Sequence, residues 1–103
     1  MTAQYRQGDV FLMEVGKLPH GAMAEAASEK IVLAYGEVTG HSHSVRAEDA
    51  KLYRDNEESY LVVENKANLI HEEHDTIALP AGVYKVVRQR EYNPRTITEF
   101  VSD

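Results

Sequence analysis

The chain has 103 residues, a formal net charge of −6 and no cysteine. This length fits one domain with a modest core, and the lack of cysteine excludes disulfides, zinc–thiolate sites and thiol nucleophiles. The acidic balance disfavours nucleic-acid binding, because phosphate contact requires a basic surface. No apolar run approaches the roughly 20 residues needed to cross a bilayer, and the amino terminus lacks a signal-peptide pattern. We therefore expect a cytoplasmic protein without membrane contact.

Short apolar runs separated by turn residues predict strands along most of the chain. A turn at residues 65–68 is expected to join two of them as a hairpin, and Pro80 with Gly82 is expected to form a tight turn. The expected strands cover residues 8–15, 30–38, 59–65 and 67–73, two stretches within 75–92, and an edge strand within 95–103.

Two stretches do not have a strand pattern. Residues 20–30 are rich in alanine and predict either one helical segment or a surface loop, and residues 46–59 are highly charged and predict a loop containing a short strand. Many short strands at a spacing of about ten residues are typical of small barrels and sandwiches. The predicted fold is therefore a single all-β domain, 1–103, forming a small barrel or sandwich.

Four of the five histidines fall in two short motifs, His-Ser-His at 41–43 and His-Glu-Glu-His at 71–74. Alternate residues of a strand share a face, so His41 and His43 are expected to point the same way, with Cα atoms roughly 6.6 Å apart. On a regular strand His71 and His74 would point to opposite faces. Either only one of them joins a site, His74 before His71, or the chain turns between them.

The histidine motifs predict a divalent metal site, because without cysteine the ligands must be nitrogen and oxygen atoms. Such donors suit Zn, Fe, Mn, Ni or Cu and do not choose among them. The competing interpretation is that polar side chains simply occupy the solvated face of a sheet. The carboxylates that could complete the site are Glu37, Glu48, Glu72 and Glu73.

The spacing around the first motif resembles the first signature of the cupins. Gly36, His41, His43 and Glu48 follow its order, although the spacer after the glycine is one residue short. Pro80 and Gly82 match the Pro-x-Gly of the second signature, but Lys85 stands where a histidine is expected. The resemblance implies a double-stranded β-helix with His41, His43 and Glu48 as metal ligands. His74 or His71 would have to replace the missing histidine.

Three functions remain open from the sequence. A cupin-like metalloenzyme acting on a small molecule is the first, with Tyr35, Tyr84, Arg88 and Arg90 as candidates to orient an anionic substrate. The second is metal-free acid–base catalysis by histidine, as in a phosphoesterase or another hydrolase. The third is a non-enzymatic interaction protein with histidines at an interface. We expect the protein to self-associate, because small β-domains often cover open sheet edges by association. We expect the basic residues near the carboxyl end to pair with carboxylates, a small anionic ligand being the alternative: Lys85, Arg88, Arg90, Arg95 and Arg6.

Overall fold

The computed structural model describes residues 3–35 and 40–88, and within them the secondary structure is all β, as predicted. No helix in these two ranges is long and apolar enough to cross a membrane. The strands are β1 (Gln4–Gln7), β2 (Val10–Val15), β3 (Met23–Ala24), β4 (Lys30–Tyr35), β5 (Ser42–Arg46), β6 (Ala50–Asp55), β7 (Glu58–Leu69) and β8 (Ile77–Arg88).

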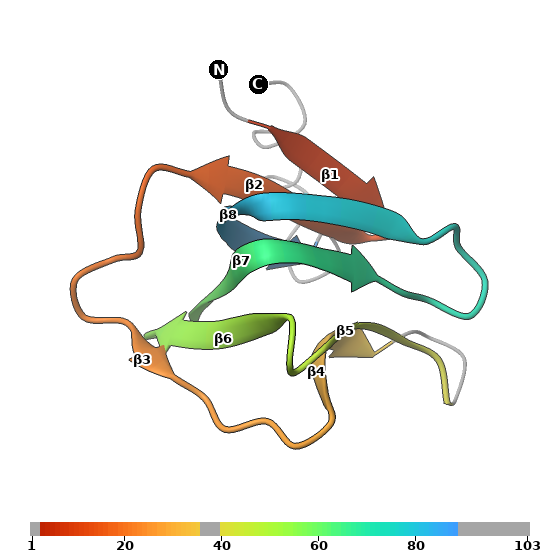
Figure 1. Ribbon diagram of the computed structural model, residues 1–103, viewed down its shortest axis with the longest axis horizontal. Coiled ribbons are helices and arrows are strands. Elements are labelled where there is room, and N and C mark those ends of the chain that lie inside the picture. The colour runs from red at the N-terminus through yellow and green to blue at the C-terminus, as the bar shows by residue number, and fades with distance from the viewer. Residues whose placement is uncertain (1–2, 36–39, 89–103) are drawn as a thin grey trace.

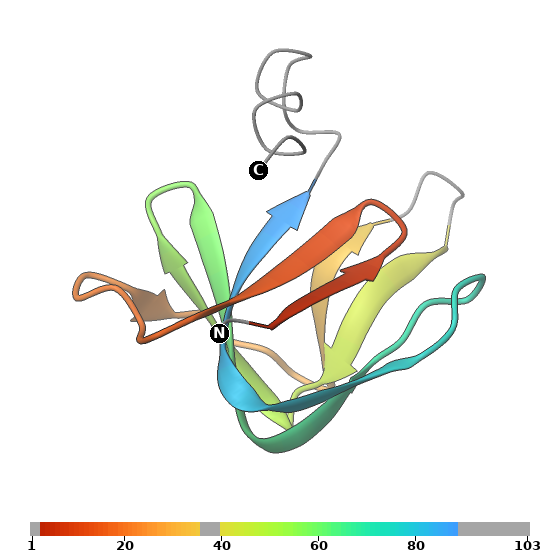
Figure 2. The same ribbon diagram turned by 90° about the horizontal axis from the view of Figure 1, so that it is seen from above.

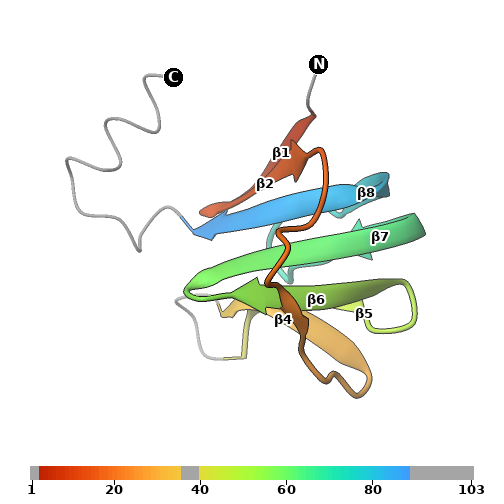
Figure 3. The ribbon, with the colours of Figure 1, turned by 90° about the vertical axis from the view of Figure 1, so that its left-hand side faces the viewer.

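Six of the strands form one antiparallel sheet in the order β1-β2-β8-β7-β6-β3, and β4 pairs with β5 in a second, small sheet. The large sheet is stacked in this order in Figure 3 and curls strongly into a half-barrel in Figure 2. The β4–β5 hairpin lies beside the open part of the curl (Figures 1 and 2). The predicted small barrel or sandwich is thus a half-barrel with an added hairpin.

The two predicted turns at 65–68 and at Pro80 are wrong, because β7 and β8 each continue through them as one strand of 12 residues. The turn residues instead form a β-bulge. Val63 pairs with Gly82 and Lys66 pairs with Pro80, so two residues of β7 lie opposite one residue of β8. A bulge bends its strand and increases the local twist, and proline is tolerated there because a bulge leaves ladder positions unpaired. These residues therefore curl the sheet rather than end its strands.

Other segments agree more closely with expectation. Residues 46–59 hold the turn before β6, β6 itself and a tight turn in which Asn56 has a φ of 59°. Asparagine tolerates this left-handed conformation better than most residues. Residues 20–30 form a surface loop that contains the short β3, not a helix. The first strand was predicted over residues 8–15, but it begins only at Val10, because Gly8 and Asp9 form the turn between β1 and β2. The predicted edge strand at 95–103 lies outside the described residues.

The core fills the concave side between the curled sheet and the small sheet. It combines fully buried residues of β2, β7 and β8, such as Leu12, Leu61 and Leu79, with Ile31 of β4 and Val45 of β5. Burying aliphatic side chains of this size contributes about 1.5–3 kcal/mol each to folding. The shared core therefore holds the hairpin against the half-barrel.

Candidate metal centre

The four histidines of the two motifs meet in one cluster, with His71 at its centre. The His71 ring centroid lies 4.3 Å from that of His43, 4.6 Å from that of His74 and 5.7 Å from that of His41. The rings come from the start of β5 and from the β7–β8 loop, which lie together at the right of Figures 1 and 2 beside the β1–β2 turn. The predicted association of the two motifs is therefore present in the structure.

An isolated β-bridge between the two sheets sets the register of the cluster. The backbones of Ser44 and Ile70 exchange two hydrogen bonds of 3.0 and 2.8 Å. In an antiparallel pairing the next residues lie opposite each other as a non-hydrogen-bonded pair, in which side chains are closer. This position brings His43 opposite His71. One step further, the Ser42 N–H donates to the Glu72 carboxylate at 3.0 Å. The two motifs thus meet because they run antiparallel from this bridge.

The chain turns between His71 and His74, which was one of the two alternatives. Strand β7 ends at Leu69 and residues 72–74 form a bend, so both rings lie on the same side of the loop despite their spacing of three. The predicted preference for His74 over His71 is not supported by burial, because His71 is 9% exposed and His74 is an exposed side chain. His71 contacts the other three rings, and His74 lies at the edge of the cluster.

Gln7, at the end of β1, holds both the loop and the His43 ring. Its side-chain Nε2 donates to the carbonyls of Leu69 and Asp75, both at 2.9 Å, and its Oε1 lies 2.9 Å from His43 Nδ1. Turning the amide around would place its oxygen against two carbonyl oxygens, so the hydrogen-bond network assigns this orientation. Gln7 is only 2% exposed. It therefore accepts a hydrogen bond from His43 Nδ1–H.

His43 is the most buried histidine of the cluster, at 2% exposure. Its Nε2 lies 3.5 Å from Asp9 Oδ1, and the other oxygen of Asp9 lies 3.5 Å from Arg88 Nε. Burial lowers the pKa of His43 below its usual 6.5, and nearby His71 lowers it further, although Asp9 acts in the opposite direction. The neutral ring is therefore favoured near neutral pH, with its proton on the Nδ1 that faces Gln7.

The outer part of the cluster contains a set of metal-type donors. One ligand atom each from His41, His71 and Glu72 lies within 4.8 Å of the other two. The Nδ1 atom of His41 is buried without a hydrogen-bond partner among the described residues, at 3.7 Å from Glu73 Oε2. The hydrogen bond from the Ser42 N–H lowers the pKa of Glu72, so this carboxylate is ionised at neutral pH.

Gly8 lets the β1–β2 turn approach the rings. Its φ is +60°, and a Cβ added there would lie 2.8 Å from His74 Nε2 and 3.3 Å from His43 Cε1. Any larger residue would be strained in this conformation and would push against the rings. The turn therefore requires glycine to bring Asp9 next to His43.

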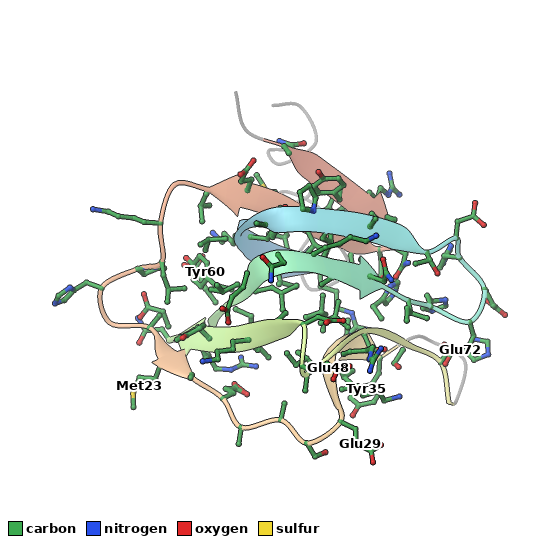
Figure 4. All side chains as sticks on the ribbon, in the orientation of Figure 1. Met23, Glu29, Tyr35, Glu48, Tyr60 and Glu72 are labelled. Atoms are coloured by element: carbon green, nitrogen blue, oxygen red, sulfur yellow. The ribbon has the colours of Figure 1, made fainter. Side chains whose placement is uncertain are left out.

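The structure does not bring Glu48 to the cluster. Glu48 is an exposed residue of the β5–β6 turn and pairs with Arg46, and Figure 4 shows it well apart from Glu72. Glu72 and Glu73, by contrast, lie beside His41 and His71. Glu37 lies outside the described residues. Lys85, which stands where the second cupin signature would have a histidine, pairs with Glu58 at 2.6 Å.

The residues proposed for anion binding are separated. Arg88 reaches the edge of the cluster through Asp9, and it also contacts the backbone carbonyl of Tyr35. Tyr84 is buried in the core, where its hydroxyl donates to the Pro80 carbonyl at 2.7 Å, and the Tyr35 side chain is exposed. The pairing of basic residues with carboxylates is confirmed for Lys85 and Arg88, whereas Arg90 and Arg95 lie outside the described residues.

Sequence reasoning missed Gln7, Gly8 and Asp9, although they are consecutive. A Gly-Asp pair signals only a turn, and nothing in its spacing relates it to histidines more than 30 residues away. The position of this turn in the fold is set by the pairing of β1 with β2 and of β2 with β8.

A family model described as "Domain of unknown function (DUF8820)" matches residues 6–89. This range contains the whole histidine cluster together with Gln7 and Asp9. No curated protein and no solved structure matches the chain.

Proposed function

Because the chain belongs to the DUF8820 family, a domain of unknown function, we propose a function from the geometry itself: a domain that binds a divalent transition-metal ion in its histidine cluster. The observation that carries this proposal is the group of His41, His71 and Glu72, whose ligand atoms lie within 4.8 Å of one another. Two atoms bound to a tetrahedral ion at about 2.1 Å are about 3.4 Å apart. Small side-chain rotations would therefore close the group around an ion.

The surroundings of the group also fit a cation. His41 Nδ1 is a buried nitrogen with no hydrogen-bond partner among residues 3–35 and 40–88, and such a group costs about 1–3 kcal/mol unless something satisfies it. Glu72 and Glu73 add negative charge beside the imidazoles. The net charge of −6 further favours cations over anions.

His71 must exchange one contact to become a ligand. Its Nδ1 accepts a hydrogen bond of 3.0 Å from the Glu73 N–H, so the proton of the neutral ring is on Nε2. Metal binding at Nδ1 would displace this hydrogen bond, and binding at Nε2 would require the proton to move. A net hydrogen bond is worth about 0.5–1.5 kcal/mol, which is small beside a metal–imidazole bond. We expect the β7–β8 loop to adjust when the ion binds.

Two imidazoles and one carboxylate leave positions on a metal ion open to water or a small ligand. A bound ion of this kind would supply Lewis-acid chemistry, such as polarising a carbonyl or lowering the pKa of water. The cupin-like enzyme expected from the sequence is the finer form of this proposal. The support for this finer proposal is the donor set of His41, His71 and Glu72, which does not include Glu48.

The proposal is tested by calorimetric titration of chelator-treated, tag-free protein with Zn²⁺, Mn²⁺ and Ni²⁺. Loss of a residue that only hydrogen-bonds to a metal ligand typically weakens metal affinity by about 10- to 100-fold. His41→Ala and His71→Ala each remove a ligand and should weaken metal binding by more than this. His20→Ala is the matched control, since His20 is an exposed loop histidine outside the cluster. Binding in the His41 and His71 variants that equals the wild type would refute the proposal.

A further inference from the structure

The ligand-bearing residues 71–74 lie beyond the last pair of the β7–β8 ladder, which joins Leu69 to Ile77. The ladder by itself therefore does not fix the position of these residues. On their amino side, Ile70 is tied to β5 by the two hydrogen bonds of the isolated bridge. What holds their carboxyl side decides how well the proposed metal ligands are placed before an ion binds.

Gln7 supplies the attachment on the carboxyl side. Its side-chain Nε2 donates to the carbonyls of Leu69 and Asp75, both at 2.9 Å, so one amide group joins the two ends of the loop. Its Oε1 lies 2.9 Å from His43 Nδ1, and the residue is only 2% exposed. Because its polar atoms are all engaged and the side chain is buried, Gln7 ties β1 firmly to the loop.

The register of β1 brings Gln7 to this place. Gln7 is the last residue of β1 and pairs with Val10, which is 0% exposed. Residues directly opposite each other in an antiparallel pair share a face of the sheet, so the Gln7 side chain points to the buried, concave side. Gly8, at a φ of +60°, then lets the turn after β1 lie against the histidine rings. The attachment is built by strand pairing and not by the loop itself.

The two carbonyls would respond differently to the loss of Gln7. The hydrogen bond to Leu69 is buried, whereas the one to Asp75 is only partly buried, and Asp75 is an exposed residue. A carbonyl near the surface can bond to water instead, but a buried carbonyl without a partner is costly. Loss of the amide should therefore free the carboxyl end of the loop toward solvent and leave the bridge at Ile70 in place.

We propose that Gln7 is a positioning residue for the metal site: it does not bind the ion, but it holds residues 71–74 so that His71 and Glu72 face His41 before the ion arrives. This inference rests on the proposed function and deepens it, because it names the residue that controls the affinity of that same site. Ligands that are already in place lose less conformational freedom on binding, and the ion is bound more tightly.

The first test needs no metal. Amide hydrogen exchange of the chelator-treated protein, followed by NMR, should show protection at Glu73, whose N–H donates to His71 Nδ1 at 3.0 Å. Gln7→Met keeps the length of the side chain and removes its hydrogen bonds. It should speed exchange at Glu73 by about 10-fold and leave Ile70 protected. Equal acceleration at Glu73 and Ile70 would indicate general destabilisation and overturn the proposal, as would free exchange of Glu73 in the wild type.

The second test measures Zn²⁺ affinity at a temperature at which every variant is folded. Gln7→Met should weaken binding by about 10-fold, the low end of the range for residues that orient metal ligands. Gln4→Met is the matched control, because Gln4 is an exposed residue of the same strand, and it should bind as the wild type does. Tyr84→Phe removes a hydrogen bond to the Pro80 carbonyl in the core. It should also keep the wild-type affinity, which separates a positioning role from a loss of stability.

The outcomes distinguish this inference from the proposed function. If the wild type binds Zn²⁺, His41→Ala loses it and Gln7→Met binds as tightly as the wild type, the role of Gln7 is refuted and the proposed function stands. A wild-type chain that binds no Zn²⁺ would refute both. If Gln7→Met fails to fold, Gln7→Glu takes its place, since it keeps an oxygen toward His43 but lacks the two N–H donors. It should show the same changes in exchange and affinity.

Discussion

At the scale of single residues, burial changes what a polar side chain does. Gln7 and Tyr84 both carry polar groups, and both are at most 2% exposed. Gln7 satisfies all of its hydrogen-bonding atoms with one histidine and two carbonyls. Tyr84 donates to the Pro80 carbonyl across the bulge. Buried polar groups are retained in proteins when they are satisfied in this way.

Tyr84 gives a pH prediction that is independent of the metal site. Burial, with Tyr5 and Glu14 nearby, raises the pKa of Tyr84 from 10.0 to about 12. The folded protein therefore keeps a proton that the unfolded chain releases, so the stability from this group is complete below about pH 10 and is lost as the pH rises toward about 12. We expect Tyr84→Phe to lower the free energy of unfolding by about 1 kcal/mol at neutral pH through the lost hydrogen bond.

The measurement is urea unfolding at several pH values. The difference in stability between wild type and Tyr84→Phe should narrow above about pH 10, because only the wild type loses the contribution of this proton. Tyr35→Phe, at a residue that is 68% exposed, should follow the wild type throughout. If wild type and Tyr84→Phe lost stability in parallel above about pH 10, the raised pKa of Tyr84 would be contradicted.

At the scale of elements, the bulge between β7 and β8 decides which residues face the core. Before it, Leu79 and Ile77 of β8 point inward; after it, Tyr84 and Val86 do. The inward positions change from odd to even numbers because one residue of β8 is opposed by two of β7. A sequence pattern of period two is interrupted at such a point, which is why the Pro-Ala-Gly stretch resembled a turn.

The end of β7 contributes to the core and leads into the histidine cluster. Substitutions at neighbouring positions there should therefore differ sharply in their effect on stability. Leu69 is 0% exposed and Ile70 is 44% exposed. Leu69→Ala should lower the free energy of unfolding by about 2–5 kcal/mol, whereas Ile70→Ala should change it by less than about 1 kcal/mol. Chemical denaturation of both variants checks this. Equal losses would show that the core does not extend to this end of the strand.

At the scale of the whole molecule, the site joins segments that are distant in the sequence. The β1–β2 turn, the start of β5 and the β7–β8 loop meet only when the half-barrel has curled and the Ser44–Ile70 bridge has formed. The unfolded chain holds no such arrangement. Binding of an ion should therefore be coupled to the stability of the entire fold.

This coupling predicts a metal-dependent melting temperature. At a free metal concentration of 100 times the Kd, the free energy of unfolding should rise by about 2.7 kcal/mol. For a domain of this size that corresponds to a rise in Tm of roughly 10–20 °C. Scanning calorimetry with Zn²⁺, and again after adding a chelator, measures the rise and its reversal. An unchanged Tm at saturation would contradict binding to the folded state.

The all-β class could be predicted from the sequence, because strand patterns and turn residues are local. It also singled out His41, His43, His71 and His74, since clustered histidines are visible without a structure. The tertiary structure was needed to show that the loop after Leu69 brings the His71 and His74 rings together, that Glu48 lies elsewhere, and that Gln7 and Asp9 contact His43. The physical reason is register: which residues of distant strands lie opposite each other depends on bulges, bridges and core packing, and a one-residue shift changes every contact.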